Sequence, residues 1–67
     1  MTVATQMQQA IASCQSVLAN LNTFALETED QNVKKMYQTL AQQQQVILDN
    51  LDARFSYIKA EEPQFNE

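Results

Sequence analysis

The chain contains no glycine, and its only proline is Pro63. Glycine and proline are the residues that most often end helices and form turns, so few breaks are available here. The dominant residues are Ala, Leu, Gln, Met and Glu, which favour helices, and the signals of strands and β-hairpins are missing. The sequence therefore predicts an all-α fold built from long helices.

The first predicted helix covers about residues 3–26 and carries no charged side chain. Its apolar residues recur in steps of four and three, which places them on one helix face. These residues are Met7, Ile11, Cys14, Leu18, Leu21 and Ala25. The opposite face is built from Gln, Ser and Asn, so another protein surface can approach it at low desolvation cost. Thr2 and Thr5 are alternative N-caps for this helix.

An acidic segment at about residues 27–30 separates the first helix from the second. Asp30 is a favourable N-cap, whereas Thr28 and Gln31 have the spacing of a capping box. The sequence leaves both starting points open for the second helix.

The second helix is expected over about residues 31–61. Pro63 stops it, because a proline biases the preceding residue away from helical backbone angles. We therefore divide the chain into a helical hairpin at residues 1–62 and a short C-terminal tail at residues 63–67.

Two apolar seams adjoin on the second helix. One contains Tyr37, Leu40, Gln44, Ile47, Leu51 and Ile58, and the other contains Ala41, Leu48 and Phe55. Two seams indicate contacts with two neighbouring helices, which is typical of a bundle rather than a two-stranded coiled coil.

An antiparallel hairpin folded about residue 28 places Cys14 near Gln44 and Ile11 near Ile47. The first helix then ends near the level of Phe55, which leaves Tyr57 and Ile58 without cover from the same chain. A second copy is the simplest cover, so we expect the hairpin to dimerise into a four-helix bundle. The expected interface residues are Leu48, Leu51, Phe55, Tyr57 and Ile58.

Several classes of function are disfavoured by the residue types present. The chain has no histidine and one cysteine, which argues against a Cys/His zinc site and an internal disulfide. No base is available to activate a nucleophile, so we expect no enzyme, no catalytic, metal or cofactor-binding residue and no cofactor. The net charge of −4 argues against nucleic acid and anionic lipid as partners. No segment resembles a signal peptide or a membrane span, so we expect a cytoplasmic protein without direct membrane insertion.

Three residues allow more than one interpretation. Cys14 is either a buried small hydrophobic residue or the site of a disulfide between subunits. Gln44 either fixes the register of the bundle or makes an incidental hydrogen bond. Phe65, in the tail, either packs back on Phe55 or Ile58 or docks on another protein.

Four segments of the chain resemble a family of small proteins from endospore-forming bacteria. They are Met1–Val3, Phe24–Thr28, Lys35–Tyr37 and Glu61–Phe65. The family is the "domain of unknown function" family numbered sixteen fifty-seven, and the resemblance covers essentially the whole chain. It implies an association with sporulation and a location in the sporulating cell or spore. It implies no activity and no site residues.

The leading hypothesis is a non-enzymatic, sporulation-associated helical protein that acts through self-association and protein–protein contact. Its expected partners are further copies of itself, as a homodimer or a higher homo-oligomer, and an unidentified spore protein. The alternative is a small carrier that holds an apolar ligand in a cavity within the helical bundle, lined by the two tyrosines and three phenylalanines.

Overall fold

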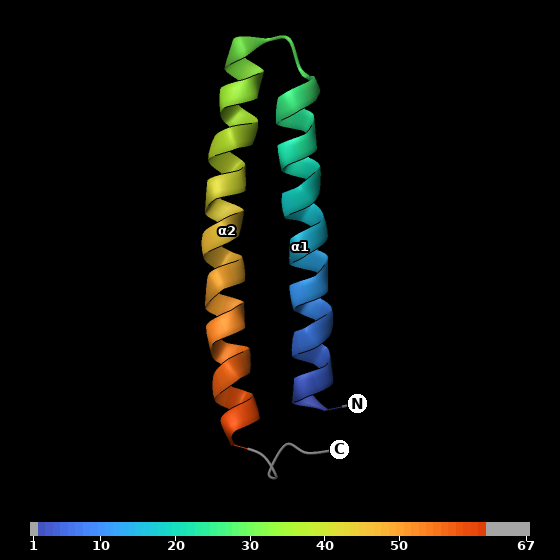
Figure 1. Ribbon diagram of the computed structural model, residues 1–67, viewed down its shortest axis with the longest axis vertical. Helices are drawn as coiled ribbons and strands as arrows, with labels where there is room; N and C mark the ends of the chain where they lie inside the picture. The colour runs from blue at the N-terminus through green and yellow to red at the C-terminus, as the bar shows by residue number, and fades with distance from the viewer. Residues whose placement is uncertain (1, 62–67) are drawn as a thin grey trace.

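The computed structural model describes residues 2–61 and contains two long helices joined by a short turn (Figure 1). Helix α1 spans Val3–Glu27 and helix α2 spans Gln31–Ala60. The helices run antiparallel, and the hairpin measures 50 × 17 × 11 Å. Its smallest dimension is about the diameter of one helix. The predicted all-α hairpin is therefore confirmed, as a layer one helix thick.

Each helix begins at a capping residue that the sequence offered. Thr2 caps α1, because its hydroxyl oxygen accepts a hydrogen bond from the backbone N–H of Thr5 at 3.2 Å. Asp30 caps α2, because its Oδ1 accepts hydrogen bonds from the backbone N–H groups of Asn32 at 2.9 Å and Val33 at 3.2 Å. The carboxylate also lies at the positive end of the helix dipole. Asp30, rather than the capping box, thus defines the start of α2.

The turn reverses the chain without a glycine. Thr28 leaves the helical conformation with φ −77° and ψ 142°, and its N–H donates to the carbonyl oxygen of Phe24 at 3.0 Å. Asp30 is also extended, with φ −77° and ψ 116°. Both capping residues have negative φ angles, so neither position requires the left-handed conformation that favours glycine.

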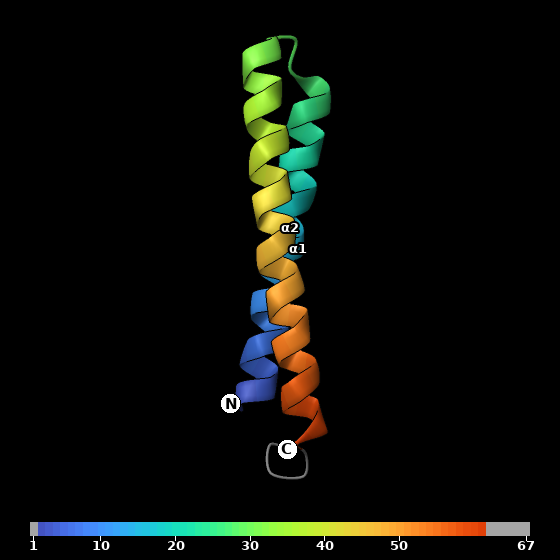
Figure 2. The same ribbon diagram turned by 90° about the vertical axis from the view of Figure 1, so that its left-hand side faces the viewer.

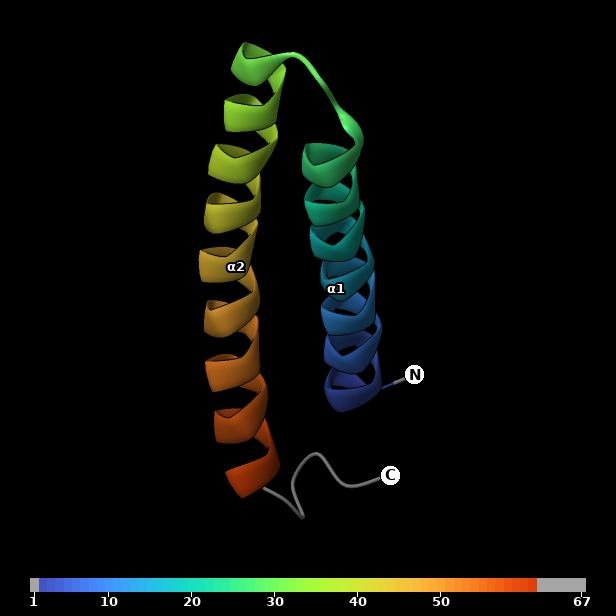
Figure 3. The same ribbon diagram turned by 45° about the horizontal axis from the view of Figure 1, so that its top comes forward.

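The two helices meet along a seam in which the residues recur in steps of three and four. The seam contains Ala4, Met7, Ile11, Cys14, Leu18, Leu21 and Ala25 of α1, and Tyr37, Ala41, Gln44, Leu48, Leu51, Phe55 and Ile58 of α2. This spacing averages 3.5 residues per turn, so the helices wind about each other as in a coiled coil. They cross at a shallow angle in Figure 2 and stay side by side in Figure 3. Of the described residues, only Ala25, Ala41, Leu48 and Ile58 are buried, and each keeps 6–7% of its surface exposed.

The seam of α2 differs from the predicted one. Ile47 was expected near Ile11 of α1 but is 49% exposed, and Leu40 of the same predicted seam is 40% exposed. Ala41 and Leu48 take that place, and the small Ala41 side chain lets the two helices approach closely. Ile58 was expected to lack cover from its own chain, which is wrong: it is only 7% exposed.

Candidate interaction surface

One side of the hairpin exposes large apolar side chains along its whole length. We call this surface the apolar face; it consists of Val3, Val17 and Phe24 of α1 and Met36, Leu40, Ile47 and Tyr57 of α2. Each of these side chains is between 40% and 55% exposed. In α1 the spacing is a multiple of seven residues throughout, whereas in α2 the residues form two such rows, Leu40 with Ile47 and Met36 with Tyr57. A seven-residue repeat runs parallel to a coiled-coil seam, so the exposed residues form continuous rows beside it.

Two contacts near the turn show that the rows of the two helices lie on the same side of the seam. The ring of Phe24 packs against that of Tyr37, with 5.6 Å between centroids and an interplanar angle of 54°. Phe24 and Val33 also line one shallow hollow of about 230 Å³. Phe24 belongs to the row that contains Val17, and Val33 belongs to the row that contains Leu40 and Ile47. The apolar face is therefore a single surface shared by α1 and α2.

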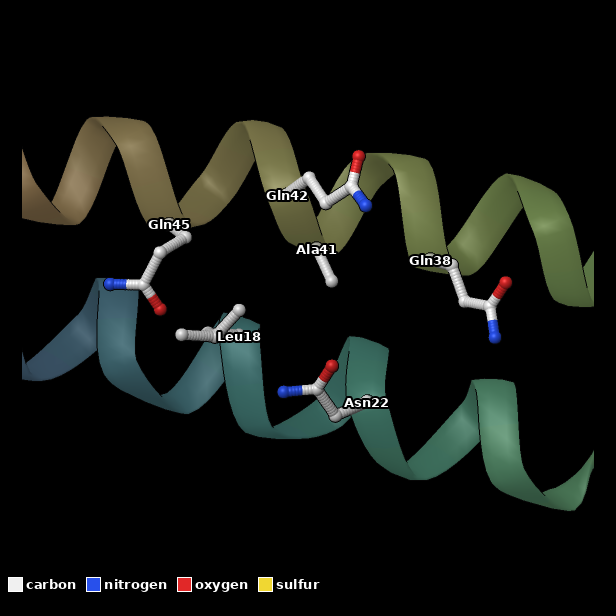
Figure 4. Close-up of a pocket in the computed structure, with 6 residues that line it drawn as sticks. All are labelled: Leu18, Asn22, Gln38, Ala41, Gln42 and Gln45. Atoms are coloured by element: carbon white, nitrogen blue, oxygen red, sulfur yellow. The ribbon is translucent and has the colours of Figure 1, made fainter.

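The opposite side of the hairpin is polar. A surface groove of about 450 Å³ lies there, with Leu18 and Ala41 between four amide side chains (Figure 4). The amides belong to Asn22, Gln38, Gln42 and Gln45. Gln45 also donates from Nε2 to Oδ1 of Asp49 at 2.9 Å. This amide-lined groove is poorly suited to a purely apolar ligand, since the amides would lose hydrogen bonds to water.

Charged residues are confined to the two ends of the apolar face. Its rows, and the polar rows that flank them, carry Glu27 beside the turn and, toward the open end of the hairpin, Arg54 and the C-cap residue Glu61 seven positions further along the same row. The guanidinium carbon of Arg54 lies 5.2 Å from the centroid of the Tyr57 ring. The middle of the face thus has no charge to desolvate when another surface covers it.

The family of the chain follows from its sequence. A family model described as "Protein of unknown function (DUF1657)" matches residues 7–55, which is more than half of the chain. The chain belongs to this family. The family resemblance noted from its short motifs is therefore confirmed, and the matched region includes the turn and most of each helix. No curated protein and no solved structure matches the chain.

In this DUF1657 protein, the five predicted interface residues lie on two different surfaces. Leu48, Leu51, Phe55 and Ile58 lie in the seam, where they hold α1 and α2 together. Tyr57 is 55% exposed and lies on the apolar face. The predicted docking residue Phe65 and the tail at residues 63–67 lie outside the described residues.

Sequence reasoning did not identify the part of the apolar face that belongs to α1. Val3, Val17 and Phe24 were not proposed as contact residues, because the stronger step of three and four directs attention to the seam. The available signal was the recurrence of apolar residues every seven positions, with Ala10 completing the row. A second row with that period predicts a second contact surface.

Gln44 makes a hydrogen bond across the seam. Its Nε2 donates to the carbonyl oxygen of Cys14 at 3.2 Å, so the two residues predicted to face each other do so. Cys14 is half-buried and its thiol is free. The hydrogen bond links α1 to α2 at one level and gives the one amide of the seam a partner.

Residues 2–61, the described part of the chain, contain neither a metal-binding cluster nor a membrane-spanning helix. Within this range, no group of three or more His, Cys, Asp or Glu residues is placed to hold a metal ion. Neither of the two described helices combines the length and the hydropathy needed to cross a membrane.

Proposed function

We propose that this DUF1657 protein is a non-enzymatic assembly protein that acts through self-association and protein–protein contact. Two hairpins pack with their apolar faces together and form a homodimeric four-helix bundle. The observation that carries this proposal is the apolar face itself, a row of large exposed hydrophobic side chains along both helices. Soluble monomers rarely expose a continuous apolar patch of this extent.

The surface area of the chain supports the proposal. Its accessible surface is 4888 Å², whereas a compact monomer of 7.6 kDa is expected to expose about 4,300 Å². The broad side of the hairpin measures 50 × 17 Å. That size is comparable to the roughly 800 Å² that each partner contributes to a standard protein–protein interface. One broad side of the hairpin is therefore large enough to support a stable dimer.

The cellular setting of the proposal is the sporulating cell or spore. This part rests on the family resemblance, as does the choice of a spore protein as the further partner. After dimerisation, the uncharged polar side of α1 and Phe65 are the candidate surfaces for that partner.

Two neighbouring residues of α2 provide a matched test of self-association. Ile47 lies on the apolar face and is 49% exposed, whereas Val46 points away from it and is 58% exposed. Ile47→Glu places a charge in the dimer interface and should convert the dimer to monomer. Val46→Glu changes the net charge equally and should leave the dimer intact.

Sedimentation equilibrium at micromolar concentration measures the outcome. The unmodified chain and Val46→Glu should show at least twice the 7.6 kDa chain mass, and Ile47→Glu should show a lower mass. Circular dichroism reports whether each variant remains helical. A folded monomer of the unmodified chain at this concentration would refute the proposal, as would equal masses for the two variants.

A further inference from the structure

We propose that the second copy packs with its turn against the open end of the first, and that Arg54 of each copy faces the acidic turn of the other. This inference rests on the proposed function, because it specifies how two apolar faces meet. It assigns Arg54, Glu29 and Asp30 to the ends of the interface, where they determine its orientation.

The apolar residues alone allow two arrangements with two-fold symmetry. In a turn-to-turn arrangement both turns lie at the same end, and α1 of one copy faces α2 of the other. Val17 then meets Leu40, with apolar residues on both sides. In a turn-to-end arrangement each helix faces the same helix of the other copy, so that Leu40 meets Ile47 and Ala10 meets Val17. Both arrangements place apolar rows of one copy against apolar rows of the other. Hydrophobic contact alone therefore does not distinguish them.

The charges disfavour the turn-to-turn arrangement. It gathers Glu27, Glu29 and Asp30 of both copies at one end of the bundle, where Lys34 and Lys35 offset only part of the negative charge and the like charges repel. At the other end it brings Arg54 beside the start of α1 at Val3. The first turn of a helix carries partial positive charge, so a guanidinium is unfavourable there.

The same charges favour the turn-to-end arrangement. Matching the rows of α2 places Arg54 opposite Val33 of the second copy, one helical turn from Asp30. The Arg54 guanidinium already extends over the ring of Tyr57, 5.2 Å from its centroid. In this arrangement the acidic turn of the second copy lies on the C-terminal side of Arg54. Tyr57 lies on that same side, so the guanidinium already extends toward the turn. Two-fold symmetry makes this contact twice in each dimer.

The distance between spin labels on the two copies tests the orientation. The native thiol is removed by Cys14→Ser, and a label is attached through Gln31→Cys in the first turn of α2. In the turn-to-end arrangement the labels lie about 38 Å apart along the bundle axis, from the 1.5 Å rise per residue. In the turn-to-turn arrangement only the width of the bundle separates them, about 20–25 Å.

A pulsed dipolar measurement distinguishes the outcomes. A distance near or above 38 Å supports the inference. A distance of about 20–25 Å overturns the orientation and leaves self-association in place. The absence of any dipolar coupling, together with a monomeric mass, refutes the proposed function and the inference with it.

Charge reversal tests the role of Arg54 directly. Arg54→Glu should raise the dissociation constant of the dimer about five- to tenfold, because it opposes Glu29 and Asp30 of the other copy. Lys59→Glu is the matched control: it makes the same charge change, but Lys59 follows the row of Gln38 and Gln45 on the polar side.

The second-site reversal Glu29→Arg should restore most of the affinity lost in Arg54→Glu. Asp30 is left unchanged because it caps α2. Equal effects of Arg54→Glu and Lys59→Glu, or no restoration by Glu29→Arg, would overturn the pairing of Arg54 with the turn.

Discussion

Val46, Ile47 and Leu48 are consecutive aliphatic residues of α2, yet they lie on three different surfaces. Leu48 is 6% exposed in the seam, Ile47 is 49% exposed on the apolar face, and Val46 is 58% exposed on the outer surface. The seam and the apolar face therefore have similar side chains but different neighbours. The seam is covered by the same chain, whereas nothing among the described residues covers the apolar face. The difference separates residues that form the hairpin from residues available for association.

The largest expected effect is in the seam. Leu48→Ala removes a buried side chain from a thin core and should lower the free energy of unfolding by about 2–5 kcal/mol. Chemical denaturation followed by circular dichroism measures this change. If association occurs through the apolar face, the loss should persist at the lowest protein concentrations, because the seam is internal to one chain.

Val46→Ala is the control for this comparison, since Val46 is mostly exposed. It should change the free energy of unfolding by no more than about 0.5 kcal/mol. A similar loss for Leu48→Ala and Val46→Ala would contradict the assignment of Leu48 to the seam.

The next effect concerns the α1 half of the apolar face. Val17→Ser removes apolar surface without a large change in helix propensity, and it should raise the dissociation constant of the dimer about tenfold. Leu26→Ser is the control, because Leu26 is 82% exposed and does not belong to the apolar face. Its dissociation constant should stay within about twofold of the unmodified value. Dilution series by sedimentation measure both, and equal weakening would mean that the interface extends beyond the apolar face.

The sequence predicted where the two helices begin and end better than it predicted which face of α2 packs against α1. Helix positions follow from local signals: Asp30 at a capping position, and no glycine or internal proline in either helix. The face that α2 turns toward α1 depends on tertiary packing. Leu40 and Ile47 are as apolar as Leu48, so hydrophobicity alone did not distinguish the two seams. The observed seam combines members of both predicted seams, and the small Ala41, which permits close approach, lies in it.

The candidate surface was only partly predictable for a related reason. Tyr57 was recognised as uncovered, and it is 55% exposed. Ile58 was grouped with it because both residues lie beyond the level at which the first helix was expected to end, but consecutive residues of a helix point about 100° apart. Val17 and Phe24 were passed over because their row is weaker than the seam beside it. A contact surface becomes visible only after the seam has been assigned.

The smallest expected effect is at Gln44, the amide of the seam. Gln44→Ala removes the 3.2 Å hydrogen bond to the carbonyl oxygen of Cys14 and should cost about 0.5–1.5 kcal/mol in the free energy of unfolding. Gln44→Leu replaces the amide by an apolar side chain of similar size, so it should preserve or raise stability. A polar seam residue that sets register disfavours other alignments, and its loss should permit them. We therefore expect Gln44→Leu, whose large apolar side chain can pack in other alignments, to sediment as a mixture of oligomers, whereas the small side chain of Gln44→Ala stabilises no other alignment and keeps one species. If Gln44→Leu instead formed a single, more stable dimer, the hydrogen bond of Gln44 would connect α1 to α2 without determining the register or the oligomeric state.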